Sequence, residues 1–169
     1  MGRAVMTAAG ISRRRADLPE LERTVLWCIR AWVISLSDRR DYAEGIENVF
    51  HQLGVGAAIA DLHGLMVTTG RGARRVIEVN CVCFPYVSAD ERLLLDALAC
   101  QQRGRHEDAF DILTGLMTDA AALDGCDHLA RMALTFAAAG HVFEAPRGAP
   151  WWPGGEQGWS SSIPATTLH

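Results

Sequence analysis

The sequence of 169 residues predicts an all-α protein. We expect a single bundle of about six helices, with one short extended segment near residues 75–83 and disordered termini. Three observations support this prediction. Apolar residues recur at helical spacing along residues 17–145. Capping residues and glycines divide that stretch into pieces of helix length. Apolar residues make up 49% of the chain, which is enough to fill a core.

Composition divides the chain into three parts. Residues 1–16 predict a flexible basic arm, and residues 17–145 predict the helical domain. Residues 146–169 are rich in Pro, Gly and Trp and predict a flexible tail, because such sequences cannot form regular structure.

The first helix is expected to begin at Asp17, which with Glu20 has the spacing of a capping box, and to run to about Leu36. It is apolar nearly all round, which is typical of a helix in the middle of a bundle. Arg23 and Arg30 would form its narrow polar edge. Amphipathic patterns predict two further helices, over about 39–53 and 56–67.

Residues 75–83 have a different pattern, in which apolar and polar residues alternate. Ile77, Val79, Cys81 and Cys83 would lie on one face of an extended segment. A lone strand needs a partner, and an unpaired edge here would favour a homodimer.

Three more helices are expected after this segment. Ser88 and Glu91 form a capping box that begins a helix ending near Arg103. The next helix begins near Arg105, and the last spans about 127–139 before Gly140. The residues predicted to lie in the core are Leu21, Val25, Trp32, Phe50, Leu94, Leu98, Leu113 and Phe136.

Part of this region resembles a known repeat. Ala97, Gly104 and Ala109 have the spacing of the small residue, turn glycine and contact alanine of a tetratricopeptide repeat. The resemblance covers one repeat, about residues 89–118, and implies an antiparallel helical hairpin and peptide binding. Cys100 stands where a tyrosine is usual, and no second repeat follows.

Charge and cysteine content exclude several functions. The formal net charge of −4 makes nucleic acid an unlikely partner. All basic residues are arginine, so chemistry that requires a lysine is excluded. Five cysteines, an odd number, are typical of a reducing, cytoplasmic protein rather than a disulfide scaffold. The apolar run from Val25 to Leu36 is broken by Arg30 and is too short to span a membrane.

Metal binding is one alternative function. Cys81 and Cys83 place two thiols on one face, and Cys100 or His106 could complete a zinc site or hold haem in a sensor protein. The usual signature has two short ligand pairs, and only one is present here, so no cofactor is predicted.

Binding of a protein or peptide is the main functional prediction. No catalytic motif stands out, although an enzyme with a pocket inside the bundle remains a further alternative. The chain is therefore predicted to be a small, non-catalytic adaptor or regulatory protein. The candidate partner-binding residues are Trp151, Trp152 and Trp159 of the tail and Arg71, Arg74 and Arg75 of a glycine-rich loop.

Overall fold

The computed structural model describes residues 13–37 and 42–144, and these residues form six α-helices. The helices are α1 (Glu20–Ser37), α2 (Ala43–Gln52), α3 (Ile59–Gly72), α4 (Ala89–Gln102), α5 (His106–Thr114) and α6 (Asp119–Ala138). Short 3₁₀ turns, η1 (Arg15–Asp17) and η2 (Gly56–Ala58), precede α1 and α3. The all-α prediction is confirmed. The tail 146–169 and residues 1–12 of the arm lie outside the described residues. None of the described helices is both long and apolar enough to span a membrane.

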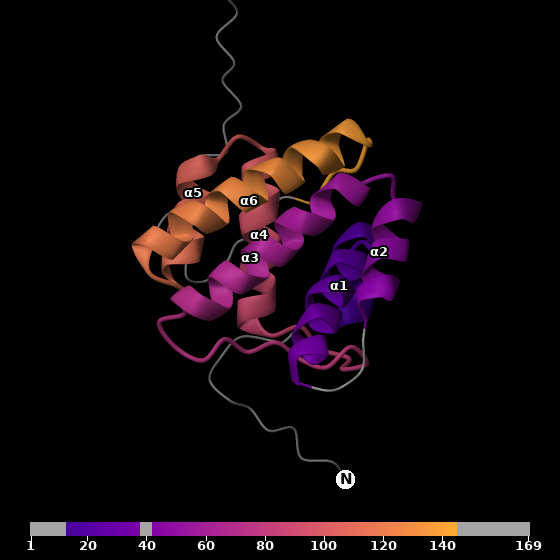
Figure 1. The fold of residues 1–169 in the computed structure, drawn as a ribbon, viewed down its shortest axis with the longest axis horizontal. Helices are drawn as coiled ribbons and strands as arrows, with labels where there is room; N and C mark the ends of the chain where they lie inside the picture. Colours follow the sequence, from indigo (N-terminus) through magenta and orange to yellow (C-terminus); the bar gives the residue numbers. More distant parts are fainter. Residues whose placement is uncertain (1–12, 38–41, 145–169) are drawn as a thin grey trace, which may run out of the picture.

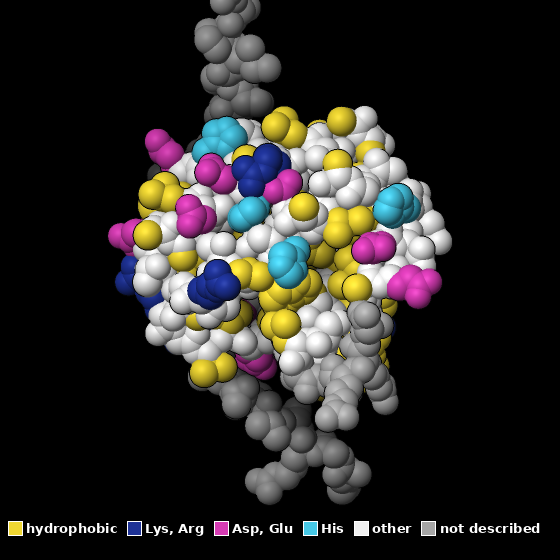
Figure 2. All heavy atoms as spheres, viewed as in Figure 1, with side chains coloured by type: hydrophobic (Ala, Val, Ile, Leu, Met, Phe, Trp, Pro, Cys, Tyr) yellow, Lys and Arg dark blue, Asp and Glu magenta, His cyan; other side chains and the backbone are white. Residues whose placement is uncertain are grey.

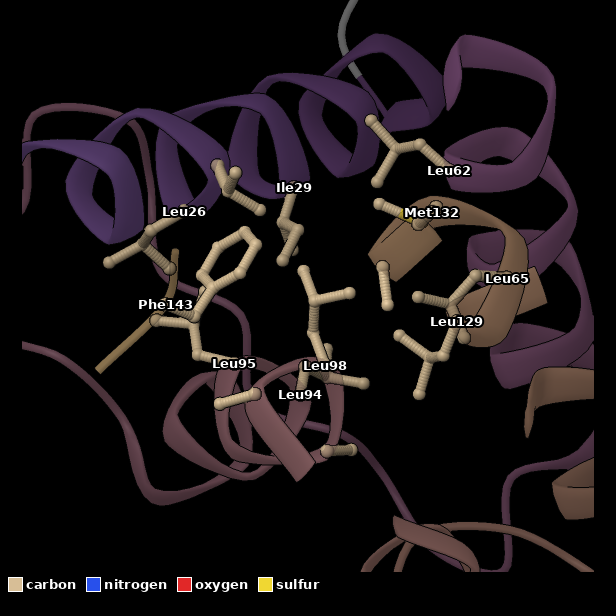
Figure 3. Close-up of a cluster of buried hydrophobic side chains, with 14 of the residues drawn as sticks. Leu26, Ile29, Leu62, Leu65, Leu94, Leu95, Leu98, Leu129, Met132 and Phe143 are labelled. Carbon is tan, nitrogen blue, oxygen red and sulfur yellow. The ribbon is translucent and has the colours of Figure 1, made fainter. Parts of the chain in front are cut away.

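The helices enclose one hydrophobic core. In Figure 1, α1 and α2 lie together on one side, while α6 lies beside α3 and close to α4 and α5. Leu26 and Ile29 of α1 face the leucines of α4 across the centre of the bundle (Figure 3). Six of the eight predicted core residues are buried. The other two, Leu21 and Trp32, are half-buried and pack against the core.

At two glycines of α3, an added side chain would need a shift of atoms in α6. A Cβ on Gly72 would lie 2.2 Å from the Ala121 Cβ, and a Cβ on Gly64 would lie 2.1 Å from the His128 ring. The predicted end of this helix near residue 67 is wrong, since α3 runs to Gly72. Gly64 and Gly72 lack side chains, so α6 can pack closely along α3 as far as Gly72.

Two predicted helix starts are also wrong. Asp17 belongs to η1, and the extended conformation of Leu18 separates it from α1, which begins at Glu20. The last helix begins at Asp119 instead of residue 127. Gly125 does not interrupt it, and lies buried inside α6 against Leu113.

A helical hairpin spans α4 and α5, as predicted for residues 89–118. The capping box is present: Glu91 N donates to Ser88 Oγ at 3.1 Å, and Ser88 N donates to Glu91 Oε2 at 2.8 Å. Gly104 has a φ of 72°, which allows the tight turn between the helices. Ala109 is fully buried at the helix contact.

The predicted extended segment forms no named strand in the described chain. Its backbone instead donates to carboxylates in the first turn of α4. Glu78 N donates to Asp90 Oδ2, and Asn80 N donates to Glu91 Oε1, both at 2.8 Å. These bonds occupy the amides of Glu78 and Asn80, which a partner strand on the same edge would use.

Candidate functional site: an arginine-lined groove

The end of the predicted basic arm is part of the folded domain. Arg14 forms an antiparallel bridge with Tyr86. Arg15 N donates to Pro85 O at 2.8 Å, and Val87 N donates to Arg13 O at 2.9 Å. These bonds fix Arg14 and Arg15 beside the start of α1.

Two adjoining pockets lie along this part of the surface. We call the two pockets together the arginine-lined groove. Arg15 and Arg23 line both pockets, so the two pockets lie next to each other. The first has a volume of about 420 Å³ and is lined by Arg14, Arg15, Ala16, Arg23, Cys83 and Pro85. The second has a volume of about 330 Å³ and is lined by Arg15, Arg23, Thr24, Trp27 and Val49.

Among the residues that the structure describes, the groove is lined by three arginines and by no acidic side chain. Arg15 uses Nη1 to donate to Val82 O at 3.0 Å. Within residues 13–37 and 42–144, the side chains of Arg14 and Arg23 have no carboxylate partner. Guanidinium groups bind carboxylates and phosphates through paired N–H donors. The groove therefore has the chemistry of an anion-binding site.

Glu22, the acidic residue next to Arg23 in the sequence, does not pair with Arg23. Its side chain is 2% exposed and lies 3.0 Å from Arg92 Nη1 through Oε2. Its other oxygen accepts a 3.1 Å bond from Glu144 N. Glu22 is therefore buried and paired with residues outside the groove.

The second pocket adds an apolar wall. Trp27 and Val49 are half-buried and pack against the core. The Trp27 ring meets Tyr42 edge-on, with centroids 6.4 Å apart, which holds the indole in place. The groove thus joins arginines to a fixed aromatic surface.

The arginines predicted from residues 70–75 do not form a basic patch. Arg74 Nη2 lies 2.6 Å from Asp119 Oδ1, and both Nη atoms of Arg75 contact Asp90. Arg71 lies exposed on α3. Trp151, Trp152 and Trp159 lie outside the described residues.

Of the four predicted metal ligands, Cys81 and Cys83 lie together, but the structure does not bring Cys100 and His106 to them as a group of metal ligands. The Sγ atoms of Cys81 and Cys83 are 3.5 Å apart and exposed. Cys100 is buried, which raises the pKa of its thiol to about 11, and His106 bonds to Gln101. No group of three or more residues that could hold a metal occurs among the described ranges.

A third pocket, between α5 and α6, is lined by both apolar and acidic side chains, the latter from Glu107 and Asp111. It has a volume of about 430 Å³ and contains Phe110, Leu123 and Cys126. Burial is the main reason that the pKa of the Cys126 thiol is raised, which favours the neutral form. This environment does not activate Cys126 as a nucleophile.

The surface over α3 and α6 differs from the groove. Figure 2 shows basic, acidic and histidine side chains interspersed there among apolar ones. Asp61 Oδ1, for example, lies 2.7 Å from Arg131 Nε and 3.0 Å from His128 Nδ1. The negative charge of Asp61 is therefore compensated by Arg131.

Sequence reasoning missed the groove because its parts are far apart in the chain. Arg14 and Arg15 were assigned to a flexible arm, and Arg23 to a solvated helix edge. The signal that could have identified them is the run Arg13–Arg15 close before a helix that carries Arg23 and Trp27. Comparisons with protein families, curated proteins and solved structures find no match to this chain.

Proposed function

We propose that the protein is a non-catalytic adaptor that binds an acidic segment of a partner protein in the arginine-lined groove. One observation carries the proposal: Arg14, Arg15 and Arg23 converge on a groove in which no acidic residue of the described part of the chain takes part. A protein with a formal net charge of −4 that gathers uncompensated arginines in one place is suited to an anionic ligand.

The apolar wall favours a peptide over a simple anion. Trp27 and Val49 continue the groove beyond the arginines, so a ligand can place carboxylates on the guanidiniums and an apolar side chain beside the indole. Aromatic and arginine side chains dominate the binding energy of many protein interfaces. We therefore propose a peptide in which Asp or Glu residues lie next to an apolar residue. Free thiols at all five cysteines agree with action in the cytoplasm.

Fluorescence anisotropy with a labelled peptide of alternating Glu and Leu tests the proposal. The double variant Arg14→Ala, Arg23→Ala removes two guanidiniums that bind no carboxylate in the described structure, so the fold should be retained. An exposed charge pair contributes up to about 1 kcal/mol of binding free energy. Loss of two such pairs should therefore weaken binding about tenfold. Arg71→Ala is the matched control, because Arg71 is an exposed arginine outside the groove.

Added salt should weaken the wild-type complex, since exposed charge pairs are screened. Equal binding by wild type and the double variant would refute the groove as the site. Tighter binding of an oligonucleotide than of the acidic peptide would refute the choice of partner.

A further inference from the structure

Cys81 and Cys83 differ from the other cysteines of the chain. Both are exposed, and their Sγ atoms lie 3.5 Å apart. Burial raises the pKa of Cys28 to about 12 and that of Cys100 to about 11, so these thiols are protected and poorly ionised. The exposed pair is therefore the dithiol that solutes can reach.

A tight turn holds the two thiols together. Phe84 N donates to Cys81 O at 3.0 Å and closes the turn over residues 81–84. The sulfurs are within reach of a disulfide bond, whose length is about 2.05 Å, after a shift of about 1.5 Å. Rotation about the two Cα–Cβ bonds can supply such a shift while the turn is kept.

Two arginines anchor the backbone of this turn. Arg30 Nη1 donates to Phe84 O at 2.8 Å and to Cys81 O at 3.3 Å. Arg15 Nη1 donates to Val82 O at 3.0 Å. Arg30 is itself fixed by a buried pair with Glu91. The turn is thus preorganised, which raises the effective concentration of one thiol at the other.

We propose that Cys81 and Cys83 form a reversible intramolecular disulfide by exchange with small disulfides. In the first step, one thiolate attacks a disulfide RSSR, a mixed disulfide forms, and one RS⁻ leaves. In the second step, the other thiolate attacks the protein sulfur of the mixed disulfide and displaces the second RS⁻. The two cysteines are oxidised, the disulfide is reduced to two thiols, and two protons pass to solvent or to the leaving thiolates. Disulfides of cytosolic proteins are usually of this transient kind.

The inference does not depend on peptide binding in the groove, although Cys83 lies on the groove wall. It is tested by equilibrating the full chain in buffers of reduced and oxidised glutathione. Free thiols are then alkylated, and the peptide that contains residues 81–83 is analysed by mass spectrometry. We expect the two cysteines to lose their alkylation together, as an internal disulfide that dithiothreitol reverses.

Single variants separate this mechanism from independent oxidation. Cys81→Ser and Cys83→Ser should stop at the glutathione mixed disulfide, because the second thiol is missing. Cys126→Ser is the control and should oxidise like wild type. The changed side chains at 81 and 83 are exposed, so circular dichroism should show the same helix content in all variants. Stable mixed disulfides on both cysteines of the wild type would overturn the proposal, as would links between chains in place of the internal one.

Discussion

Arg30 of α1 and Glu91 of α4 form an ion pair in which neither side chain is exposed to solvent, although 61 residues separate them. Nε and Nη2 of Arg30 lie 2.7 and 2.8 Å from the two carboxylate oxygens. The remaining N–H groups donate to the carbonyls of Cys81, Phe84 and Tyr86. The pair therefore connects two helices to the loop that precedes α4.

Replacing Arg30 by leucine should be strongly destabilising. The change leaves Glu91 as a buried charge without its partner, and removal of one member of a buried pair costs about 3–5 kcal/mol. Urea denaturation measures the free energy of unfolding. Arg71→Leu, at an exposed position of α3, should change it by less than about 0.5 kcal/mol. A loss for Arg30→Leu no larger than that of this control would contradict the role assigned to the pair.

Two glycines of α3 should respond in opposite ways to alanine. Gly72→Ala places a Cβ 2.2 Å from the Ala121 Cβ, and such overpacking costs about 1–3 kcal/mol. Gly70 has nothing within 4 Å of the added Cβ, so Gly70→Ala should stabilise the helix by about 0.5–1 kcal/mol. Thermal unfolding compares the two variants. Similar effects of both changes would show that α3 and α6 do not approach as closely as described.

Asp90 should contribute stability that depends on pH. Its hydrogen bond with Arg75 is the main cause that holds the pKa of Asp90 below its ordinary value, against the opposing effect of burial. Such a carboxyl stabilises the folded state above its unfolded pKa, and this contribution is lost as pH falls through the folded pKa. Asp90→Asn should therefore be less stable than wild type at pH 7, and the difference should narrow below about pH 4.

Denaturation curves at several pH values measure this difference. Asp124→Asn, at an exposed position of α6, is the control and should track wild type throughout. A difference between Asp90→Asn and wild type that stays constant across the acid range would refute the linkage.

Some local signals in the sequence predicted local structure correctly, although the spacing of Asp17 and Glu20 did not. The capping box of Ser88 and Glu91 involves residues three apart, so its pattern is complete in the sequence, and the structure confirms it. The positive φ of Gly104 and Gly140 likewise agrees with their predicted places at helix ends. Element identity followed from these patterns because capping and periodicity depend on near neighbours.

Features that depend on distant partners were not predictable. The third helix was expected to end near residue 67, because the contact of Gly72 with Ala121 is not visible in the sequence. Arg30 looked like part of a polar edge, yet it is buried because Glu91 and the loop carbonyls surround it. The groove depends in the same way on the pairing of Arg14 with Tyr86, which brings the basic segment to α1.

A nuclear magnetic resonance titration of the ¹⁵N-labelled full chain with the Glu–Leu peptide tests the central proposal most directly. We predict that the largest shifts fall on the amides of Ala16 and Thr24 and on the indole N–H of Trp27, because these residues line the groove. Shifts centred on Phe110 and Leu123 of the α5–α6 pocket, or no saturable shifts at all, would contradict the proposal that the arginine-lined groove binds an acidic partner.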